Sequence, residues 1–257
     1  MSSILVTGSE GYIGSFLARH LMSRSHVVSR CMKHVPYQTP SFYPPTVIHL
    51  AAHSSVSACA NDPEGAVRNN LLDLIKFAML LPPETRLFFA STGAIHDQAE
   101  KVTLYDATKR GAEAVLPTIH PNTCIMRFGT VCGVSPFMRS DTLLNAMTQD
   151  AVRKGVVQVR NRLCNRPVLF IQDLADHGTS LVEGAGMPEI VEMAKKNRTI
   201  HQWGEQVASL SGAELIEQPG NGTYDFRMPT MGDTDERAVI QDLLDHWKRQ
   251  EATRGGI

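Results

Sequence analysis

The chain begins with the sequence SSILVTGSEGYIG, which covers residues 2–14. Ile4 to Val6 is an apolar run of the kind that forms a buried strand, and Ile13 to Met22 repeats apolar residues at the spacing of an amphipathic helix. The glycine-rich stretch between them must therefore turn the chain sharply from a strand into a helix. By itself such a stretch could be an ordinary tight turn, so its function depends on what the glycines allow.

Three glycines occupy this turn at positions suited to a dinucleotide. Gly8 permits the sharp turn, Gly11 lets the backbone approach a pyrophosphate, and Gly14 lets the helix pack closely on the sheet. The helix start at Tyr12 and Ile13 adds N–H groups and the positive end of the helix dipole. Because a strand precedes the turn and a helix follows it, the motif predicts a binding site for NAD or NADP.

Further apolar runs alternate with helical patterns along the first half of the chain. One helix is expected from Pro63, with Asp62 as its N-cap, to about Met79, and another after Tyr105. The alternation predicts an α/β protein with a Rossmann-type, doubly wound parallel sheet. Residues 33–46 hold four prolines and no periodicity, so one strand–helix unit of that fold is expected to be missing. The expected strands are Val27 to Val28, Val47 to Leu50, Leu87 to Phe89 and Cys124 to Phe128.

The pattern becomes looser after about residue 129, which indicates a second region. We expect residues 1–129 to form the dinucleotide-binding domain and residues 130–257 a small C-terminal substrate-binding region, with a segment at about 166–194 returning to the first sheet. Within the second region, Thr199 begins a capping box for a helix that stops at Gly212. The last helix is expected from about Thr234, with acidic residues in its first turn and basic residues in its last.

Composition and charge exclude several kinds of partner. The 25 basic and 26 acidic side chains leave a net charge of −1, so no overall field would hold nucleic acid or an anionic membrane. No run of about 18 apolar residues is present, and the first residues lack the pattern of a signal peptide. The five cysteines are scattered, without metal-binding spacing. We expect a soluble, cytoplasmic protein without a metal site.

The end of the second expected strand bears on the choice of cofactor. NAD-binding folds usually place a carboxylate there to hold the ribose 2'-hydroxyl, but this chain reads Val27-Val28-Ser29-Arg30-Cys31-Met32-Lys33. Arg30 or Lys33 could meet the 2'-phosphate of NADP instead. The alternative is that both are solvated surface cations. We favour NADP and keep NAD open.

The candidate catalytic groups come from a helix and from the strand before it. Tyr105 and Lys109 are four residues apart, so they share one face of a helix. A lysine cation favours the phenolate of a neighbouring tyrosine, whose ordinary pKa of about 10 otherwise makes it a poor base. The strand that starts at Leu87 ends in Ser91 and Thr92, where open α/β sheets present residues to a ligand. Each feature alone could be structural, as a helix-surface pair and two turn hydroxyls.

Taken together, these motifs resemble the short-chain dehydrogenase/reductase superfamily, in particular its extended branch of nucleotide-sugar epimerases, dehydratases and reductases. The resemblance extends nearly from end to end. It also covers Val47 to Ala52, whose family counterpart lines the cofactor with the alanines at Ala51 and Ala52, and Asn70, which falls at the helix asparagine of that branch. Further matches are Met126 to Gly133, after the catalytic helix, and Arg166 to Ala175, which resembles a segment of sugar epimerases.

The resemblance implies roles for individual residues. Thr92, rather than Ser91, takes the position of the catalytic hydroxyl, and Lys109 also holds the cofactor ribose. Gly93-Ala94 replaces the acid pair of sugar dehydratases, which disfavours dehydration. Thr130 stands where relatives carry a substrate-contacting asparagine, and His53 lies near the expected cleft. Relatives often pair two helices into a dimer, so a homodimer is expected.

Arg166 matches the family arginine that meets the diphosphate of a nucleotide sugar. Four further cations lie near it around an expected strand from Val156 to Val159, namely Arg153, Lys154, Arg160 and Arg162. Such a concentration would suit a phosphate group. The alternative is a solvated edge strand on which cations discourage edge pairing.

Three functions remain open at this point. The first is an NAD(P)-dependent epimerase or reductase that transfers a hydride at a carbon of a nucleotide sugar. The second is an NADPH-dependent reductase of a small carbonyl compound, which needs no diphosphate site. The third is a dinucleotide sensor without catalysis, because a fold does not dictate chemistry.

Overall fold

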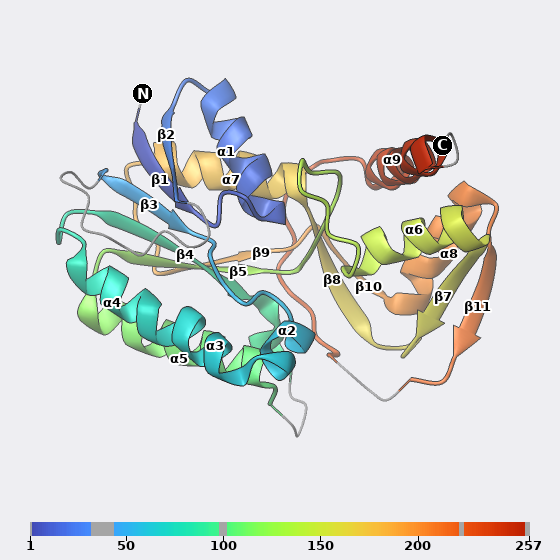
Figure 1. Cartoon of the computed structure of the whole chain (residues 1–257), viewed down its shortest axis with the longest axis horizontal. Helices are drawn as coiled ribbons and strands as arrows, with labels where there is room; N and C mark the ends of the chain where they lie inside the picture. Colours follow the sequence, from blue (N-terminus) through green and yellow to red (C-terminus); the bar gives the residue numbers. More distant parts are fainter. Residues whose placement is uncertain (1, 32–43, 98–101, 221–223, 255–257) are drawn as a thin grey trace. The chain divides into compact units, whose positions relative to one another are not determined.

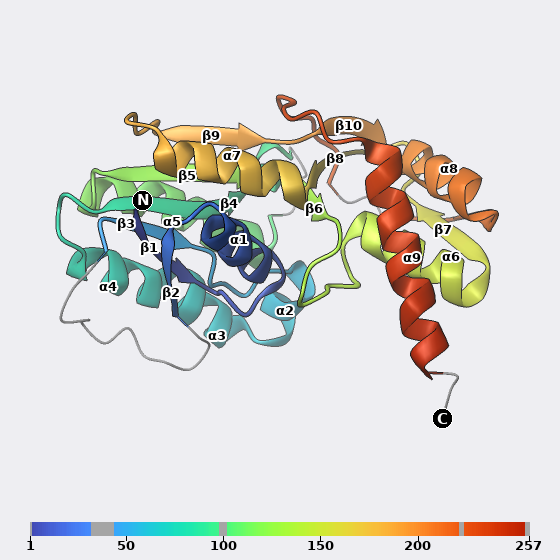
Figure 2. The ribbon, with the colours of Figure 1, turned by 90° about the horizontal axis from the view of Figure 1, so that it is seen from above.

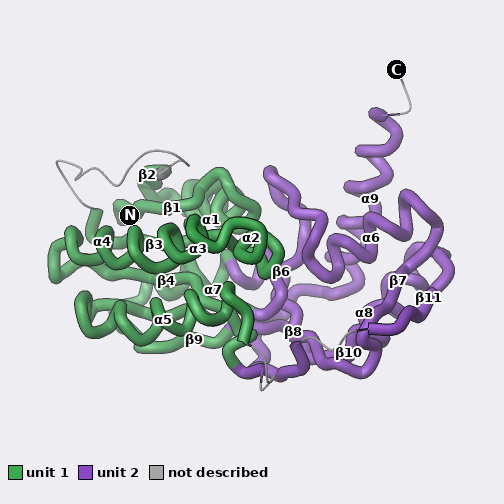
Figure 3. Tube along the Cα trace, turned by 60° about the horizontal axis from the view of Figure 1, so that its bottom comes forward, with its two compact units in different colours: residues 1–95, 100–128, 175–192 green, residues 96–99, 129–174, 193–257 purple. Residues whose placement is uncertain are grey.

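The chain folds as two units that alternate along the sequence (Figure 3). A computed structural model describes residues 2–31, 44–97, 102–220 and 224–254. Unit 1 contains residues 1–95, 100–128 and 175–192, and unit 2 contains residues 96–99, 129–174 and 193–257. The chain thus leaves unit 1 after residue 128 and comes back to it for one helix and one strand.

Unit 1 is built on a six-stranded sheet in the order β2-β1-β3-β4-β5-β9 (Figure 1). The pairings among β1 to β5 are all parallel, which confirms the predicted Rossmann-type arrangement and its five strands. Burial on both faces explains their nearly continuous apolar sequences. The strands are β1 (Ser3–Thr7), β2 (Val27–Cys31), β3 (Thr46–His49), β4 (Arg86–Thr92), β5 (Thr123–Phe128) and β9 (Ile190–Met193).

Helices cover both faces of this sheet (Figure 2). On one face, apolar residues of α4 and α5 pack on β3 and β4, with Phe77 and Leu116 among the buried side chains. The other face carries α1 and α7, where Gly178 lies against Leu17. The helices are α1 (Tyr12–Ser23), α2 (Val56–Asn61), α3 (Pro63–Val67), α4 (Asp73–Leu80), α5 (Leu104–Ile119) and α7 (Ile171–Glu183), with a π-helical turn η1 (Arg68–Leu72) and a 3-10 turn η2 (Gly93–His96).

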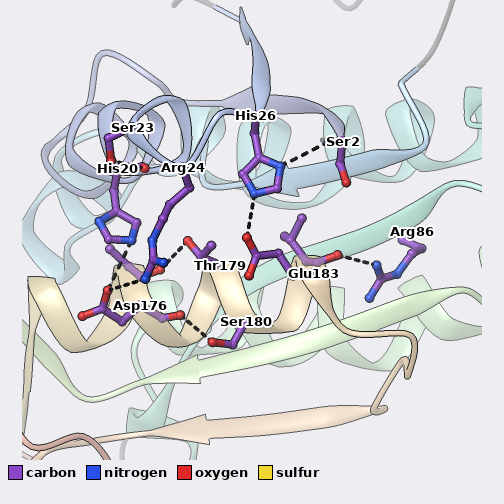
Figure 4. A network of polar contacts seen from close by, with 12 residues as sticks. Ser2, His20, Ser23, Arg24, His26, Arg86, Asp176, Thr179, Ser180 and Glu183 are labelled. Atoms are coloured by element: carbon purple, nitrogen blue, oxygen red, sulfur yellow. Dashed lines mark hydrogen bonds and ion pairs between the residues drawn. The ribbon is translucent and has the colours of Figure 1, made fainter.

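A polar network fastens α7 to the rest of unit 1 (Figure 4). His20 of α1 lies 3.3 Å from Asp176, and His26, just before β2, lies 3.1 Å from Glu183. Arg86 of β4 donates to two carbonyl oxygens in the last turn of α7, both at 2.8 Å. Because a helix leaves its last carbonyls without intrahelical donors, this guanidinium acts as the cap of α7.

The missing strand–helix unit was predicted for residues 33–46, most of which lie outside the described residues. In the part of the chain that the structure describes, β2 is the outermost strand beside β1, and β3 takes the place directly on the other side of β1. The same described residues include no helix long and apolar enough to cross a membrane.

Unit 2 contains two small sheets and three helices. One sheet has the order β10-β8-β6 and the other pairs β11 with β7 in parallel. Trp203, fully buried, lies at the centre of its core and donates its indole N–H to the carbonyl of Arg166 at 3.0 Å. The elements are β6 (Thr130–Cys132), α6 (Leu143–Lys154), β7 (Val156–Arg160), β8 (Asn165–Phe170), β10 (Lys196–Thr199), α8 (Ile200–Ser211), β11 (Glu214–Gln218) and α9 (Glu236–Arg254).

Several local predictions for unit 2 are confirmed. Thr199 and Gln202 form the capping box of α8, and Gly212 ends that helix in the left-handed conformation with φ of 73°. The strand predicted at Val156 to Val159 is β7. The last helix begins two residues after the expected start at Thr234.

Candidate active site

The glycine-rich turn joins β1 to α1 in the tight geometry that its sequence predicts. Gly8 has φ of 67°, and a Cβ there would lie 2.8 Å from the backbone nitrogen of Ala51. At Gly14 a Cβ would lie only 2.2 Å from the carbonyl oxygen of Gly8. Gly11 is the N-cap of α1 and supplies no side-chain hydrogen bond. A backbone with N–H groups at the start of a helix and no side chain in front of them fits a pyrophosphate.

The end of β3 is tied to this turn through Thr7. The Thr7 hydroxyl accepts the N–H groups of Leu50 and Ala51, each at 3.2 Å, and lies 3.1 Å from Nδ1 of His49. Ala51 and Ala52 are half-buried and follow directly after β3. The predicted cofactor-lining alanines are therefore held beside the glycine turn.

Asn70 lies in the π-helical turn η1, and the structure shows where its amide binds. Its Oδ1 accepts the backbone N–H of His53 at 2.7 Å, and its Nδ2 donates to the His53 carbonyl at 3.2 Å and to the Thr108 hydroxyl at 3.2 Å. The amide thus clamps the loop after β3 onto α5. Single π-turns of this kind are often found at functional sites.

His53, a predicted substrate contact, is held by side chains on two sides. Its Nε2 lies 3.1 Å from a carboxylate oxygen of Asp62, and its Nδ1 lies 3.3 Å from the amide of Asn69. Arg30, the predicted contact to NADP, is exposed at the end of β2 and donates to the sulfur of Met22 at 3.5 Å. Lys33 lies outside the described residues.

Lys109 is buried at the carboxyl end of the sheet. Its ammonium donates to the carbonyl of Ala90 at 2.7 Å and lies 4.7 Å from the centre of the Phe89 ring. Burial lowers the pKa of Lys109 from 10.5 to about 8, and the nearby Cys59 and Glu113 oppose this shift. None of the ion pairs formed by the described residues includes Lys109. A cation in such a site is costly, which points to a function for it.

Tyr105 lies on the same helix as Lys109, and Thr92 ends the strand whose Ala90 carbonyl binds the Lys109 ammonium. Tyr105 is half-buried, one turn before Lys109 near the start of α5, which Thr103 caps through the N–H of Asp106 at 3.2 Å. Thr92 is buried as the last residue of β4, and its hydroxyl accepts the N–H of Ala94 at 3.1 Å. The hydroxyl of Ser91 binds Glu113 instead.

Two polar residues near this site have no counterpart in the sequence analysis. Glu113 stands one further turn along α5 from Lys109, and it binds both Ser91 and Arg127 of β5. The spacing of Glu113 from Lys109, four residues, was a usable signal for a shared helix face. Nothing local in the sequence indicates that Arg127 reaches the same carboxylate.

Thr130 and Arg166, the remaining predicted substrate contacts, belong to unit 2. Thr130 is the first residue of β6 and half-buried. The Arg166 guanidinium lies 5.2 Å from the centre of the Tyr224 ring and donates to the Tyr224 carbonyl at 3.5 Å. Its buried Nε has no hydrogen-bond partner among the described residues, and burial lowers the pKa of Arg166.

The cations near Arg166 do not form a common positive cluster, contrary to the sequence argument. Arg153 pairs with Glu251 at 2.6 Å, Lys154 with Asp150 at 2.8 Å and Arg162 with Glu217 at 2.8 Å, while Arg160 donates to Gln218 at 2.9 Å. Acidic and amide groups folded against β7 account for these contacts. Arg166 therefore differs from its neighbours in having a buried nitrogen without a partner.

Comparison with known proteins shows the family to which the chain belongs. The sequence profile of the NAD dependent epimerase/dehydratase family matches residues 4–191. The chain belongs to this family. It is accordingly an enzyme of the short-chain dehydrogenase/reductase type, as the motifs predicted. One relative, a protein of Rhizobium meliloti (strain 1021) named Probable UDP-glucuronate 4-epimerase, is 24% identical in an alignment that covers 91% of this chain and 82% of the relative.

Solved structures of other proteins share this fold at low sequence identity. RMD from Pseudomonas aeruginosa, complexed with NADPH, superposes with a TM-score of 0.83 at 14% identity and covers 97% of this chain and 100% of its own. UDP-glucose 4-epimerase from Thermus thermophilus, in complex with NAD, gives a TM-score of 0.77 at 21% identity, with 96% and 99% covered. These likenesses show that the fold is shared. The match to an NAD dependent family supports a nicotinamide dinucleotide as the cofactor.

Proposed function

We propose that this family member is an NAD(P)-dependent epimerase or reductase that transfers a hydride at a carbon of a nucleotide sugar. The observation that carries the proposal is the buried ammonium of Lys109, held by the Ala90 carbonyl one helical turn from Tyr105. A structural lysine has no need of such a site, since burying its charge costs free energy. A cation beside the phenol of Tyr105 favours proton exchange by that phenol.

Each residue has a defined task in the proposed reaction. When bound, the nicotinamide ring accepts or supplies the hydride. Tyr105 exchanges the proton of the sugar hydroxyl or carbonyl, and Thr92 donates a hydrogen bond to the same oxygen. Lys109 stabilises the phenolate of Tyr105 and holds the ribose of the cofactor. The glycine turn, with Gly8, Gly11 and Gly14, binds the pyrophosphate.

The substrate class is supported by the named relatives and by Arg166. UDP-glucuronate and UDP-glucose appear in the names of the relatives described above. A guanidinium can bind two phosphate oxygens at once, and the Nε of Arg166 has no partner among the described residues. We assign Arg166 and Thr130 to substrate binding, with His53 as a further contact. Arg30 at the end of β2 favours NADP over NAD.

A homodimer in the cytoplasm is part of the proposal. Three apolar side chains on the η1–α4 segment are exposed, namely Leu72 at 48%, Met79 at 68% and Leu80 at 44%. Apolar residues of this size on one helical segment suit contact with a second copy. Light scattering of the purified protein at several concentrations tests the dimer, and a monomer at every concentration would contradict it.

The experiment that tests the function screens nucleotide sugars with NAD, NADH, NADP and NADPH. Turnover is followed by absorbance of the reduced cofactor and by the stereochemistry of the product. Tyr105→Phe should remove most turnover and leave cofactor affinity nearly intact, because it deletes the hydroxyl that exchanges the proton and changes little volume. Thr92→Val should also reduce turnover, whereas Thr118→Val, on the exposed side of α5, is the matched control.

Two outcomes would overturn the proposal in different ways. Near-native turnover in Tyr105→Phe would remove the catalytic assignment. Preference of the parent protein for carbonyl compounds without a diphosphate would replace the nucleotide sugar by a small carbonyl substrate. Epimerisation and reduction are distinguished by whether cofactor is consumed in proportion to product.

A further inference from the structure

A buried polar cluster lies beside the proposed catalytic residues, within unit 1. We call it the Glu113 cluster, and it consists of Ser91 on β4, Glu113 on α5, Arg127 on β5 and Glu192 on β9. Ser91 donates its hydroxyl to Glu113. Arg127 donates to Glu113 through Nη2 at 2.7 Å and to Glu192 through Nη1 at 3.2 Å. Glu113 thus receives hydrogen bonds from both strands.

The side chains of this cluster are mostly shielded from solvent. Exposed fractions are 10% for Glu113, 18% for Arg127 and 21% for Glu192. Hydrogen bonds to a carboxylate in such surroundings are strong and directional. The geometry of β4 relative to α5 is therefore constrained at this point.

Two consecutive residues of β4 bind two consecutive turns of α5. The Ala90 carbonyl accepts from Lys109 at 2.7 Å, and the next residue, Ser91, donates to Glu113. Thr92 follows directly after these contacts on the strand, and Tyr105 lies one turn before Lys109 on the helix. The two contacts hold the strand beside the helix directly before Thr92.

We propose that Glu113 is a positioning residue of the active site, which holds the end of β4 in register with α5 through Ser91 and supports the ammonium of Lys109 by its negative charge. The proposal rests on the function proposed above, because it assigns the task of Glu113 through Thr92, Tyr105 and Lys109. Glu113 itself has no contact with the reacting atoms in this scheme. The role of Arg127 is to orient the carboxylate.

The charge of Glu113 acts on Lys109 against the effect of burial. It raises the pKa of Lys109, as does Cys59 of α2. Three other ionisable groups belong to this site: Tyr105, one turn before Lys109 on α5, His49 of β3, whose pKa burial lowers to about 3, and Asp106 of α5, which acts on Cys59. Other charges near α5 form pairs of their own, as His53 in the loop after β3 does with Asp62, Arg68 with Glu64 and Lys76 with Asp73. Glu113 is therefore the carboxylate whose negative charge acts on Lys109.

A purely structural ion pair is the competing explanation, and Glu192 provides the control for it. Glu192 binds the same guanidinium from the other side and does not contact Ser91. If the cluster only joins strands, Glu113→Gln and Glu192→Gln should have similar effects. If Glu113 positions the site, only Glu113→Gln should change catalysis.

The test compares Glu113→Gln, Ser91→Ala and Glu192→Gln in steady-state kinetics over pH 6 to about 10. Glu113→Gln should lower kcat at least about tenfold, because a displaced Thr92 or Tyr105 loses its alignment. It should also move the alkaline limb of kcat/KM to lower pH by about 0.5 or more, since Lys109 loses a stabilising negative charge. Ser91→Ala should lower kcat without moving that limb. Glu192→Gln should leave both quantities near the parent values.

A second measurement does not depend on activity. The Nζ resonance of Lys109, in protein labelled with ¹⁵N-lysine and without cofactor, is identified by its absence from Lys109→Met. Its titration should move to lower pH in Glu113→Gln and stay in place in Ser91→Ala and Glu192→Gln. Should Glu113→Gln fail to fold, Glu113→Asp keeps the charge and shortens the side chain, so it should lower kcat with the titration unchanged.

Failure of this inference is distinguishable from failure of the proposed function. Two results together would overturn the role of Glu113 alone. Tyr105→Phe would be inactive, and Glu113→Gln would match Glu192→Gln both in its kinetics and in its Lys109 titration. An active Tyr105→Phe would overturn the proposed function and the inference with it. Equal losses in Glu113→Gln and Glu192→Gln, with an unmoved Lys109 titration, would reduce the cluster to a structural ion pair.

Discussion

The buried ammonium of Lys109 makes the stability of the chain depend on pH in a direction that follows from its pKa. The pKa falls from 10.5 to about 8 on folding, mainly through burial, and the side chain is only 4% exposed. A difference of about 2.5 pH units, at about 1.36 kcal/mol for each, corresponds to roughly 3 kcal/mol. Lys109→Met removes this titration.

The sign follows from which state binds the proton. Below about pH 8 both states are protonated, and the folded state carries the full cost of the buried charge. Between about 8 and 10.5 the unfolded chain still binds a proton that the folded chain has released, so rising pH favours folding. The free energy of unfolding of the parent should therefore rise across this window by up to about 3 kcal/mol relative to Lys109→Met.

Denaturant unfolding at several pH values between 7 and about 10.5 measures the effect. The quantity of interest is the parent-minus-variant difference in the free energy of unfolding, because other titrating groups cancel in it. Lys76→Met is the matched control, since the Lys76 side chain is 74% exposed and its difference should stay flat. A parent-minus-Lys109→Met difference that is constant or falls between pH 8 and 10.5 would refute the reasoning.

Three further predictions concern binding. Arg30→Ala should weaken the binding of NADP at least about tenfold and that of NAD little, because it removes a charge-assisted contact to the 2'-phosphate. Calorimetry with both cofactors measures the two affinities, and an equal loss of affinity for both would contradict the prediction. Arg166→Ala should raise the apparent KM for the substrate at least about tenfold with cofactor affinity unchanged. Arg160→Ala loses only an exposed contact to an amide, so it should match the parent in the same kinetics. Asn70→Leu should lower the free energy of unfolding by about 2 kcal/mol or more, since the backbone N–H and C=O of His53 lose their partner. Calorimetry should also show weaker cofactor binding, because the loop after β3 is released.

Most of the first sheet could be predicted from the sequence because its signals are local. Ile4 to Val6 and Leu87 to Phe89 are short apolar runs bounded by turn residues, and each became a parallel strand. The backbone of Gly8 has the positive φ that its place in the motif requires. Thr199 likewise marks the start of α8 by its side-chain hydroxyl, and Gly212 marks its end by a left-handed backbone conformation.

Contacts between distant residues could not be read from the sequence. The amide of Asn70 binds the backbone of His53, 17 residues away, and no local pattern predicts that partner. The cations near Arg166 were expected to act together, but each is bound by another side chain, and for Arg153 that partner is Glu251, 98 residues away. Periodicity reports which face of an element is buried, and it does not report which polar groups meet there.

The division of the chain between its two units has a consequence for how such a protein can change. The chain leaves unit 1 after β5, returns to it with α7 and β9, and leaves it again after β9, so the segments between β5 and α7 and after β9 are additions to the six-stranded sheet. Insertions, deletions and recombination can remodel these two pieces without breaking a strand of the sheet that carries the glycine turn. A fragment that ends at residue 128 would lack β9, so β5 would become an exposed edge strand and Arg127 would lose its partner Glu192. Because α7 begins at Ile171 and β9 ends at Met193, an exchange that keeps this sheet and its helix intact must join the chain between β5 and Ile171 and after Met193.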